Sequence, residues 1–229
     1  RSYCFESPTA MVKYKELYSI LILNSGSHAE VVEMALRAGK TVFCEKPLAY
    51  SRAEMKAIEK ARAESGSKLM IGYMKTFDPA VIEAQKAIKT RPRTVDVLVL
   101  HPSGDSQLIT SDESLNMPKP SNELIETFTK SRVAVQEEAL GKAGAASFGN
   151  LYSEMVLGSV IHEFSVLRAL DIRISEVDYV DRWPAGSASD SIIVCGRTSD
   201  GVRVTVRWFY LDQYPMYQEE IRWVSGEEG

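Results

Sequence analysis

The first 90 residues alternate short apolar runs with amphipathic segments, and this alternation constrains the fold more than any other feature. Residues 19–23, 41–44 and 68–73 are short and mostly apolar, with bounding turn or cap residues, and so predict buried strands. Residues 28–38 and 52–65 lie between them and have the apolar spacing of helices. Strands that alternate with helices predict right-handed crossovers and a doubly wound parallel sheet.

Helix start and stop signals support this reading. A serine and a glutamate three residues apart form a capping box before each of the two helices, and a glycine follows each helix. The boxes are Ser27 with Glu30 and Ser51 with Glu54, and the glycines are Gly39 and Gly66. Further helices are expected over residues 7–18, after the cap residue Ser7, and from Asp78-Pro79 to about Lys89.

The sequence changes character after Arg91-Pro92-Arg93, which we take as a domain boundary. We expect a strand over 94–100, a loop over 101–120, helices over 122–139 and 152–170, and a loop over 141–149. Strands are expected over 191–197, 202–211 and 217–224, with a hairpin turn at Ser199-Asp200-Gly201. The last three strands predict an antiparallel meander with one buried face.

Composition excludes several classes of function. The net charge is −4, the charged residues (25%) have both signs interspersed, and no basic stripe predicts nucleic-acid binding. No apolar run has the length of a membrane span, and the N-terminal residues lack a signal core. The three cysteines and the scattered aspartates have no metal-ligand spacing, so we expect no metal. Unpaired, widely separated cysteines are typical of reduced thiols in a cytoplasmic protein.

Glu45-Lys46-Pro47 is the most informative short motif. It follows the predicted strand 41–44, and ligands of open parallel sheets bind beyond the carboxyl ends of the strands. A lysine there, restricted by the following proline, can point its ammonium at a bound substrate. The alternative is a solvated Glu-Lys pair before an ordinary turn.

Several ordered motifs together resemble the Gfo/Idh/MocA family, that is, the glucose–fructose oxidoreductase and inositol dehydrogenase family. The motifs are Ala38-Gly39-Lys40-Thr41-Val42, Glu45-Lys46-Pro47 and Gly72-Tyr73-Met74-Lys75-Thr76-Phe77-Asp78-Pro79. The resemblance implies that residues 1–90 form the C-terminal half of a dinucleotide-binding Rossmann domain. It implies that residues 91–229 form an α+β domain for substrate binding and oligomerisation, with a largely antiparallel open sheet that is incomplete at the C-terminus.

The resemblance also implies a chemistry, an NAD(P)-dependent hydride transfer to or from a sugar, cyclitol or related small polar metabolite. Lys46 would contact the reacting oxygen and His162 would act with it as the second catalytic residue. The expected cofactor-binding residues, for NAD or NADP, are Asn24, Ser25, His28, Glu45, Lys46 and Pro47. The expected substrate-binding residues are Lys46, Tyr73 and His162. The open sheet would pair subunits into a homo-oligomer.

Several of these residues also have a structural alternative. His28 could be an exposed residue of the first helical turn, Tyr73 could only pack, and His162 could be a helix histidine satisfied by hydrogen bonds.

The chain departs from the family pattern at several positions. Gly158 replaces an aspartate that usually precedes the histidine by one helical turn, and Met74 and Thr76 replace a frequent asparagine and arginine. No Gly-x-Gly-x-x-Gly turn follows any predicted strand. We expect an interior fragment of a longer polypeptide; the alternative is a short protein that lost cofactor binding. The alternative function is a catalytically inactive relative that senses a ligand or cofactor as a regulatory protein.

Overall fold

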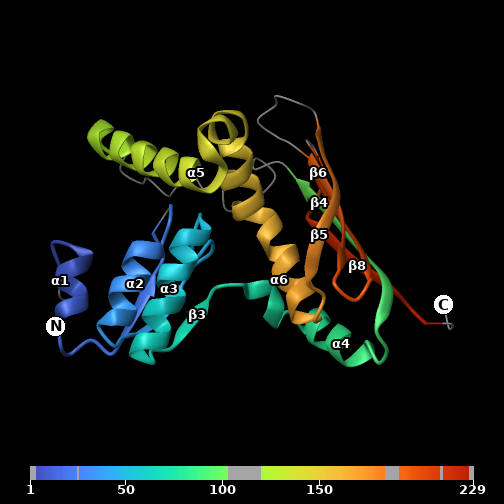
Figure 1. Cartoon of the computed structure of the whole chain (residues 1–229), viewed down its shortest axis with the longest axis horizontal. Helices are drawn as coiled ribbons and strands as arrows, with labels where there is room; N and C mark the ends of the chain where they lie inside the picture. Colours follow the sequence, from blue (N-terminus) through green and yellow to red (C-terminus); the bar gives the residue numbers. More distant parts are fainter. Residues whose placement is uncertain (1–3, 25, 103–119, 184–190, 212–213, 227–229) are drawn as a thin grey trace. The chain divides into compact units, whose positions relative to one another are not determined.

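The computed structural model describes residues 4–24, 26–102, 120–183, 191–211 and 214–226 (Figure 1). The chain divides into two compact units. The first unit comprises Arg1–Tyr73 and Pro120–Ile161, and the second comprises Met74–Lys119 and His162–Gly229. The functional boundary expected at residue 91 stays a prediction.

The first unit contains the predicted parallel sheet. Its three strands lie in the order β1-β2-β3, and both neighbouring pairs are parallel. Its elements are α1 (Pro8–Lys13), β1 (Ser19–Ile22), α2 (Ala29–Arg37), β2 (Thr41–Cys44), α3 (Arg52–Ser65), β3 (Leu69–Ile71), α5 (Asn122–Asn150) and the π-helix η3 (Leu151–Val160). The Rossmann-like α/β architecture is thereby confirmed.

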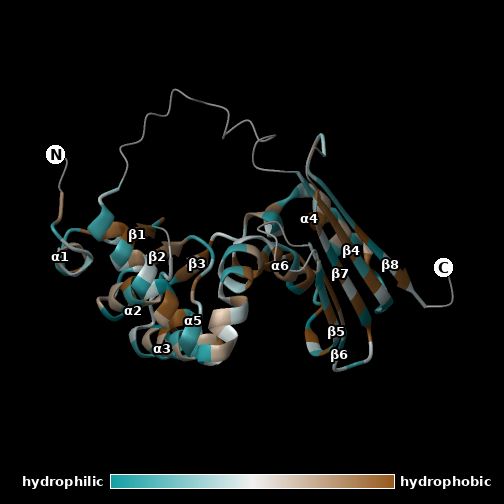
Figure 2. Cartoon of the chain, turned by 90° about the horizontal axis from the view of Figure 1, so that it is seen from above, coloured by the Kyte–Doolittle hydropathy of each residue, from teal (hydrophilic) through white to brown (hydrophobic). Residues whose placement is uncertain are grey.

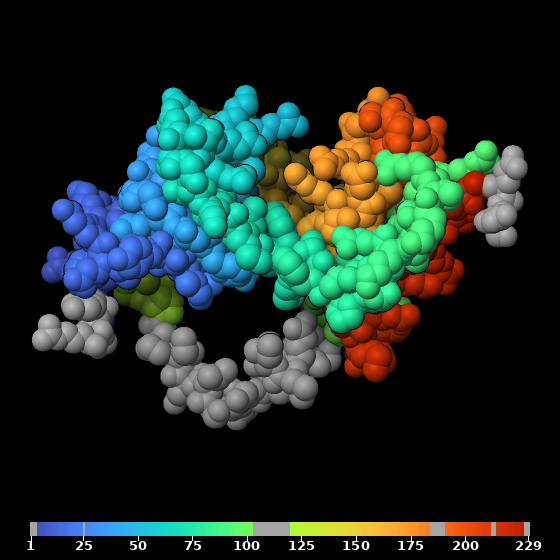
Figure 3. Space-filling view, turned by 90° about the horizontal axis from the view of Figure 1, so that it is seen from below, coloured from blue at the N-terminus to red at the C-terminus, as the bar shows by residue number. Residues whose placement is uncertain are grey.

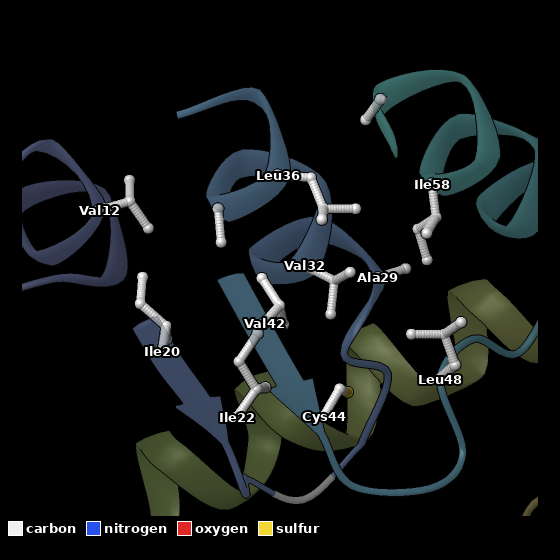
Figure 4. Close-up of a cluster of buried hydrophobic side chains, with 12 residues drawn as sticks. Val12, Ile20, Ile22, Ala29, Val32, Leu36, Val42, Cys44, Leu48 and Ile58 are labelled. Atoms are coloured by element: carbon white, nitrogen blue, oxygen red, sulfur yellow. The ribbon is translucent and has the colours of Figure 1, made fainter. Parts of the chain in front are cut away.

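A hydrophobic core fills the space between the sheet and the helices α2 and α3 (Figure 4). Val32 and Leu36 of α2 are 0% exposed and Ile58 of α3 is 2% exposed. Burial of one such side chain contributes about 1.5–3 kcal/mol. Alternate residues of β1 point away from this core, and Leu21 and Leu23 are therefore exposed.

The two predicted capping boxes have different outcomes. Ser51 and Glu54 form a complete box at the start of α3, with each side chain bonded to the other residue's backbone. The box predicted for Ser27 is wrong, because His28 is the N-cap of α2 and makes no side-chain cap bond. Ser27 instead accepts from the backbone of Ala29 at 3.3 Å and donates to Glu54 at 2.6 Å.

The first helix is shorter than predicted. Ser7 caps α1 as expected, but the helix ends at Lys13 instead of continuing to residue 18. The buried ammonium of Lys40 accounts for the difference, because it donates to the backbone oxygens of Tyr14 and Leu17 at 2.9 and 2.6 Å. These carbonyl groups are satisfied without a helix.

The loop predicted over residues 141–149 is also wrong, because α5 continues to Asn150 with a break at Gly141 (φ 72°, ψ 162°). Gly149 serves close helix packing instead of a turn. A Cβ atom there would lie 2.7 Å from Oε1 of Gln136, whose amide donates to the backbone oxygen of Gly149 at 2.9 Å. Most of the loop expected over 101–120 lies outside the described residues.

The second unit is built on a mixed sheet of five strands in the order β5-β6-β7-β4-β8. Only the β4–β7 pair is parallel, so the largely antiparallel sheet is confirmed. Hydropathy alternates along β4 and β7, as Figure 2 shows. The elements of the second unit are η1 (Met74–Phe77), α4 (Pro79–Ala87), β4 (Pro92–Pro102), α6 (Ile161–Ala169), β5 (Ile174–Trp183), β6 (Ser191–Thr198), β7 (Arg203–Leu211) and β8 (Gln218–Ser225). The first residue of α6, Ile161, still belongs to the first unit.

The predicted meander is right for one pair of strands and wrong for the other. β6 and β7 form an antiparallel hairpin around the predicted turn, where Gly201 has a φ of 93°. β8 pairs with β4 instead of β7. The sequence pattern also does not predict β5, whose residues are mostly exposed and include several charged side chains.

Candidate functional site

Three loops of the first unit lie at one edge of its sheet. Because β1, β2 and β3 are parallel, their carboxyl ends meet at the same edge; β1 and β2 run in the same direction in Figure 4. Asn24 follows β1, Glu45-Lys46-Pro47 follows β2, and Gly72-Tyr73 follows β3. The structure therefore gathers most of the predicted cofactor-binding residues at one place. Ser25 lies outside the described residues.

Lys46 is held by the π-helix η3. Its ammonium donates a hydrogen bond to the backbone oxygen of Gly158, and the hydroxyl of Tyr152 donates to the backbone oxygen of Tyr50. The Lys46–Pro47 peptide bond is cis. Short π-helical segments occur frequently at functional sites. The loop after β2 is thus tied to η3 at two points, and Lys46 is one of them.

Nothing near Gly158 requires a glycine on steric grounds. A Cβ atom added there would lie 3.6 Å from the backbone oxygen of Ser153, which is an ordinary contact, and its φ is not positive. The position where the resemblance leads us to expect an aspartate therefore contributes a backbone carbonyl to Lys46 in place of a carboxylate.

Glu45 lies against the end of β3. A Cβ atom at Gly72 would come within 2.8 Å of Oε1 of Glu45, so any other residue there would displace this carboxylate from its present position. The other carboxylate oxygen accepts from the backbone of Lys46 at 3.2 Å. Glu45 thus connects the loops after β2 and β3, and its contact with a cofactor stays a prediction.

His28 connects the loops after β1 and β2. Its ring is 1% exposed, and its two nitrogens lie 2.6 Å from the backbone oxygen of Asn24 and 2.7 Å from that of Pro47. Both partners are backbone carbonyl oxygens, so the ring contacts the two loops through main-chain atoms. The alternative of an exposed residue in the first helical turn is wrong. His28 shapes the candidate cofactor site through the backbone.

The remaining predicted residues are Tyr73 and His162. Tyr73 is half-buried directly beyond β3, in the first unit. His162 is buried in α6 of the second unit, and its backbone oxygen accepts from the hydroxyl of Ser165 at 2.6 Å. Lys46 and His162 belong to different units, and each is placed within its own.

A buried charged cluster in the second unit escapes the sequence reasoning. The ammonium of Lys75 lies 2.5 Å from Oε1 of Glu163, 2.5 Å from the hydroxyl of Tyr217 and 2.8 Å from Oε2 of Glu219. Lys75 belongs to the motif Gly72–Pro79 and Glu163 follows His162 directly. Their closeness in sequence to predicted site residues could therefore have indicated both of them. Nothing in the sequence pattern marks Tyr217 or Glu219.

The pKa values in this cluster follow from burial and charge. Burial lowers the pKa of Lys75, but Glu163 and Glu219 together outweigh burial and raise that pKa above its ordinary value. Burial raises the pKa of Glu163 more than Lys75 lowers it. Burial likewise raises the pKa of the Tyr217 hydroxyl.

The cluster borders a cavity of about 550 Å³ in the second unit. Lys75 and Glu219 line it together with apolar residues of α4 and β8, among them Val81, Ile221 and Trp223. The surfaces of α4 and β8 lie side by side in Figure 3, where they are green and red.

The residues that the structure describes hold neither a metal-ligand cluster nor a helix suited to cross a membrane. Within these residues no three His, Cys, Asp or Glu side chains are grouped so that they could hold a metal ion. Among the helices that the structure describes, none has the length and apolarity needed to cross a membrane.

Comparison with known proteins finds relatives of the N-terminal part of the first unit. Residues 2–73 match the model of an oxidoreductase family with an NAD-binding Rossmann fold, GFO_IDH_MocA. An inositol 2-dehydrogenase of Paracoccus denitrificans is 36% identical over 86 residues, which is 37% of this chain and 26% of that protein. One of Pseudomonas fluorescens is 38% identical over 94 residues, 40% of this chain and 28% of that protein. The chain thus matches about a quarter of the length of these relatives.

Solved structures extend the likeness of fold to both units. A probable dehydrogenase from Thermotoga maritima covers 97% of this chain with a TM-score of 0.67 and 16% identity, and 58% of that structure is matched. A scyllo-inositol dehydrogenase from Lactobacillus casei, with bound NAD(H) and scyllo-inositol, covers 98% with a TM-score of 0.65 and 17% identity, and 59% of it is matched. At this identity the likeness concerns the fold alone.

The family model and the ordered motifs coincide on the same residues. The match over 2–73 includes the loops that carry Asn24, Lys46 and Tyr73. Residues 2–73 are therefore similar to the Gfo/Idh/MocA oxidoreductase family, whose model describes an NAD-binding Rossmann fold.

Proposed function

We propose that the protein carrying this chain is an NAD(P)-dependent oxidoreductase that transfers hydride between a nicotinamide and a hydroxyl or carbonyl group of a cyclitol or related small polar metabolite. The observation that carries the proposal is the position of Lys46. It lies beyond the carboxyl end of β2, inside the matched segment, with its ammonium held by η3. The inositol 2-dehydrogenases among the relatives support a cyclitol as the substrate class.

The sheet edge of the first unit fits a dinucleotide. The carboxyl ends of three parallel strands meet there, which is where nucleotides bind in such sheets. Asn24, Ser25, Glu45, Lys46 and Pro47 would hold the cofactor, and His28 would fix the two loops that carry them. The bound nicotinamide would accept or supply the hydride.

Lys46 would stabilise the charge that develops on the substrate oxygen. Its acceptor in η3 is a neutral carbonyl, which orients the ammonium and itself adds no negative charge. A fixed positive charge beside a developing alkoxide lowers the barrier, because it is already in place when the charge forms. Tyr73 would line the substrate side of the same edge.

His162 would exchange the proton of the substrate hydroxyl. Imidazole exchanges protons near neutral pH, which suits general acid–base catalysis. His162 is buried near the start of α6, and a buried ring keeps its proton transfers apart from bulk water. Self-association through the open sheet and a cytoplasmic location also stay predictions.

The test compares Lys46→Met and Lys46→Arg with the unmodified native protein. Myo-inositol, scyllo-inositol and a sugar panel are offered with NAD and with NADP, and turnover is read from the absorbance of the reduced nicotinamide. We expect Lys46→Met to lose turnover while cofactor affinity, read from nicotinamide fluorescence, stays near normal. Full activity of Lys46→Met would refute the role of Lys46. Cofactor binding by the unmodified protein without turnover of any substrate would favour the regulatory alternative.

A further inference from the structure

We propose that Lys75, Glu163, Tyr217 and Glu219 form a positioning network that fixes the start of α6 and thereby the catalytic histidine next to Glu163. The inference rests on the proposed function, in which His162 exchanges the substrate proton. Lys75 is a positioning residue in this proposal, because it acts through Glu163 and not on the substrate itself.

The hydrogen bonds of Lys75 are complete. A lysine ammonium has three N–H donors, and three acceptors lie within 2.8 Å of Nζ, on Glu163, Tyr217 and Glu219. The Tyr217 hydroxyl accepts from Lys75 and donates to Glu219 at 3.0 Å, which closes a ring of hydrogen bonds. The ammonium also lies 5.0 Å from the centroid of the Tyr217 ring. A fully bonded ammonium has one preferred position, so the groups around it are fixed as well.

The network joins parts of the second unit that are distant in sequence. Lys75 lies in η1 and Glu163 in the first turn of α6. Tyr217 directly precedes β8, and Glu219 is its second residue. The bonds from Lys75 span 88 residues to Glu163 and 144 residues to Glu219. α6 is therefore tied at its first turn to both η1 and the sheet.

The burial of Glu163 makes any shift of α6 away from Lys75 energetically costly. Its side chain is 0% exposed, whereas Lys75 is 19% exposed and Glu219 is 20% exposed. A shift of α6 that separated Glu163 from Lys75 would leave a carboxylate without water or counter-charge. His162 precedes Glu163 by one peptide bond, so the position of its backbone follows that of Glu163.

The competing explanation is that the network only stabilises the second unit. Both explanations predict a lower melting temperature when Lys75 is replaced. Only the positioning role predicts a slower chemical step in protein that is still folded, together with a changed environment of the His162 ring. The experiment therefore measures kcat and the histidine signals on folded protein.

The variants are Lys75→Met, Lys75→Arg and Glu219→Gln in the native protein, with Lys86→Met as the matched control. Lys86 also forms an ion pair in the second unit, with Glu83, but the two side chains are 65% and 71% exposed. We expect kcat of Lys75→Met to fall on the order of 100-fold, as for a displaced catalytic group, with the KM for the cofactor unchanged. Lys75→Arg should recover part of kcat, and Lys86→Met should leave it unchanged. If Lys75→Met does not fold, Glu219→Gln carries the test with the same expected direction.

A spectroscopic measurement separates this proposal from the proposed function. The ¹⁵N-labelled imidazole signal of His162 is the one that disappears in His162→Gln, and the signal of His28 is the one that disappears in His28→Gln. Lys75→Met should shift the His162 signal and leave the His28 signal in place. An unshifted His162 signal, or an unchanged kcat in folded Lys75→Met, would overturn the positioning role. If His162→Ala retains full turnover while Lys75→Met still shifts the His162 signal, the catalytic role of His162 fails and the positioning network stands.

Discussion

Replacement of Lys75 by methionine should destabilise the second unit strongly. Methionine fills the space of the aliphatic stem but removes the charge between Glu163 and Glu219. Loss of one partner of a buried ion pair costs about 3–5 kcal/mol, and the Glu163 side chain is 0% exposed. The Glu219 contact is 20% exposed and adds at most about 1 kcal/mol. We therefore expect a loss of about 3–5 kcal/mol in the free energy of unfolding.

Tryptophan fluorescence during guanidinium unfolding reports this loss. The three tryptophans, Trp183, Trp208 and Trp223, all belong to the second unit. The midpoint of the transition should fall while the denaturant slope stays the same. Lys86→Met, which breaks an exposed pair, should change the stability by less than about 1 kcal/mol.

A double variant tests the electrostatic reason for the loss. Lys75→Met combined with Glu163→Gln leaves no uncompensated charge at the fully buried position, so it should recover much of the stability. A loss below about 1 kcal/mol in Lys75→Met, or no recovery in the double variant, would refute the reasoning.

Three further predictions concern titratable groups. The pKa values of Lys75 and Tyr217 are raised in the folded protein from ordinary values of 10.5 and 10.0. These two groups therefore stabilise the fold fully below their ordinary pKa values, and this stabilisation is lost as the pH rises through their higher folded pKa values. The melting temperature of the second unit should fall from about pH 10 upward. The Arg91 guanidinium lowers the pKa of Asp200 to about 2, so Arg91→Gln should raise the titration midpoint of that carboxyl in a ¹³C NMR titration. Burial raises the pKa of the Cys44 thiol to about 12, so iodoacetamide at about pH 8 should label it only after unfolding.

The elements that the sequence predicts well are those fixed by local interactions. β1, β2 and α3 follow from short apolar runs and from the box of Ser51 and Glu54, which involves residues three positions apart. The parallel order follows from the alternation of these elements. The hairpin at Gly201 likewise depends on a positive φ that its sequence signals directly.

The elements that the sequence predicts badly depend on distant partners. α1 ends early because Lys40, 26 residues after Tyr14, takes a carbonyl that a helix would use. Gly149 lies in a helix because Gln136 approaches it closely. The pairing of β8 with β4 joins segments that are more than 100 residues apart, and no local pattern indicates it.

The candidate site shows the same division. The loop residues around Lys46 could be identified because they follow predicted strands and belong to ordered motifs. The Lys75 cluster could not, because its bonds cross 88 to 144 residues and none of its side chains forms a short motif with another. The structural role of His28 was equally hidden, since its acceptors are backbone oxygens and carry no residue identity.

Gly158 shows why one departure from a motif does not decide the activity. Loss of a carboxylate would matter most if Lys46 had no other acceptor to orient it. The backbone oxygen of Gly158 accepts from Lys46, and every residue type carries such an oxygen. The geometry of η3, and not the side chain at position 158, therefore orients the lysine. In the proposed mechanism, a carboxylate at this position would add negative charge beside the ammonium and would weaken its attraction for a substrate oxygen.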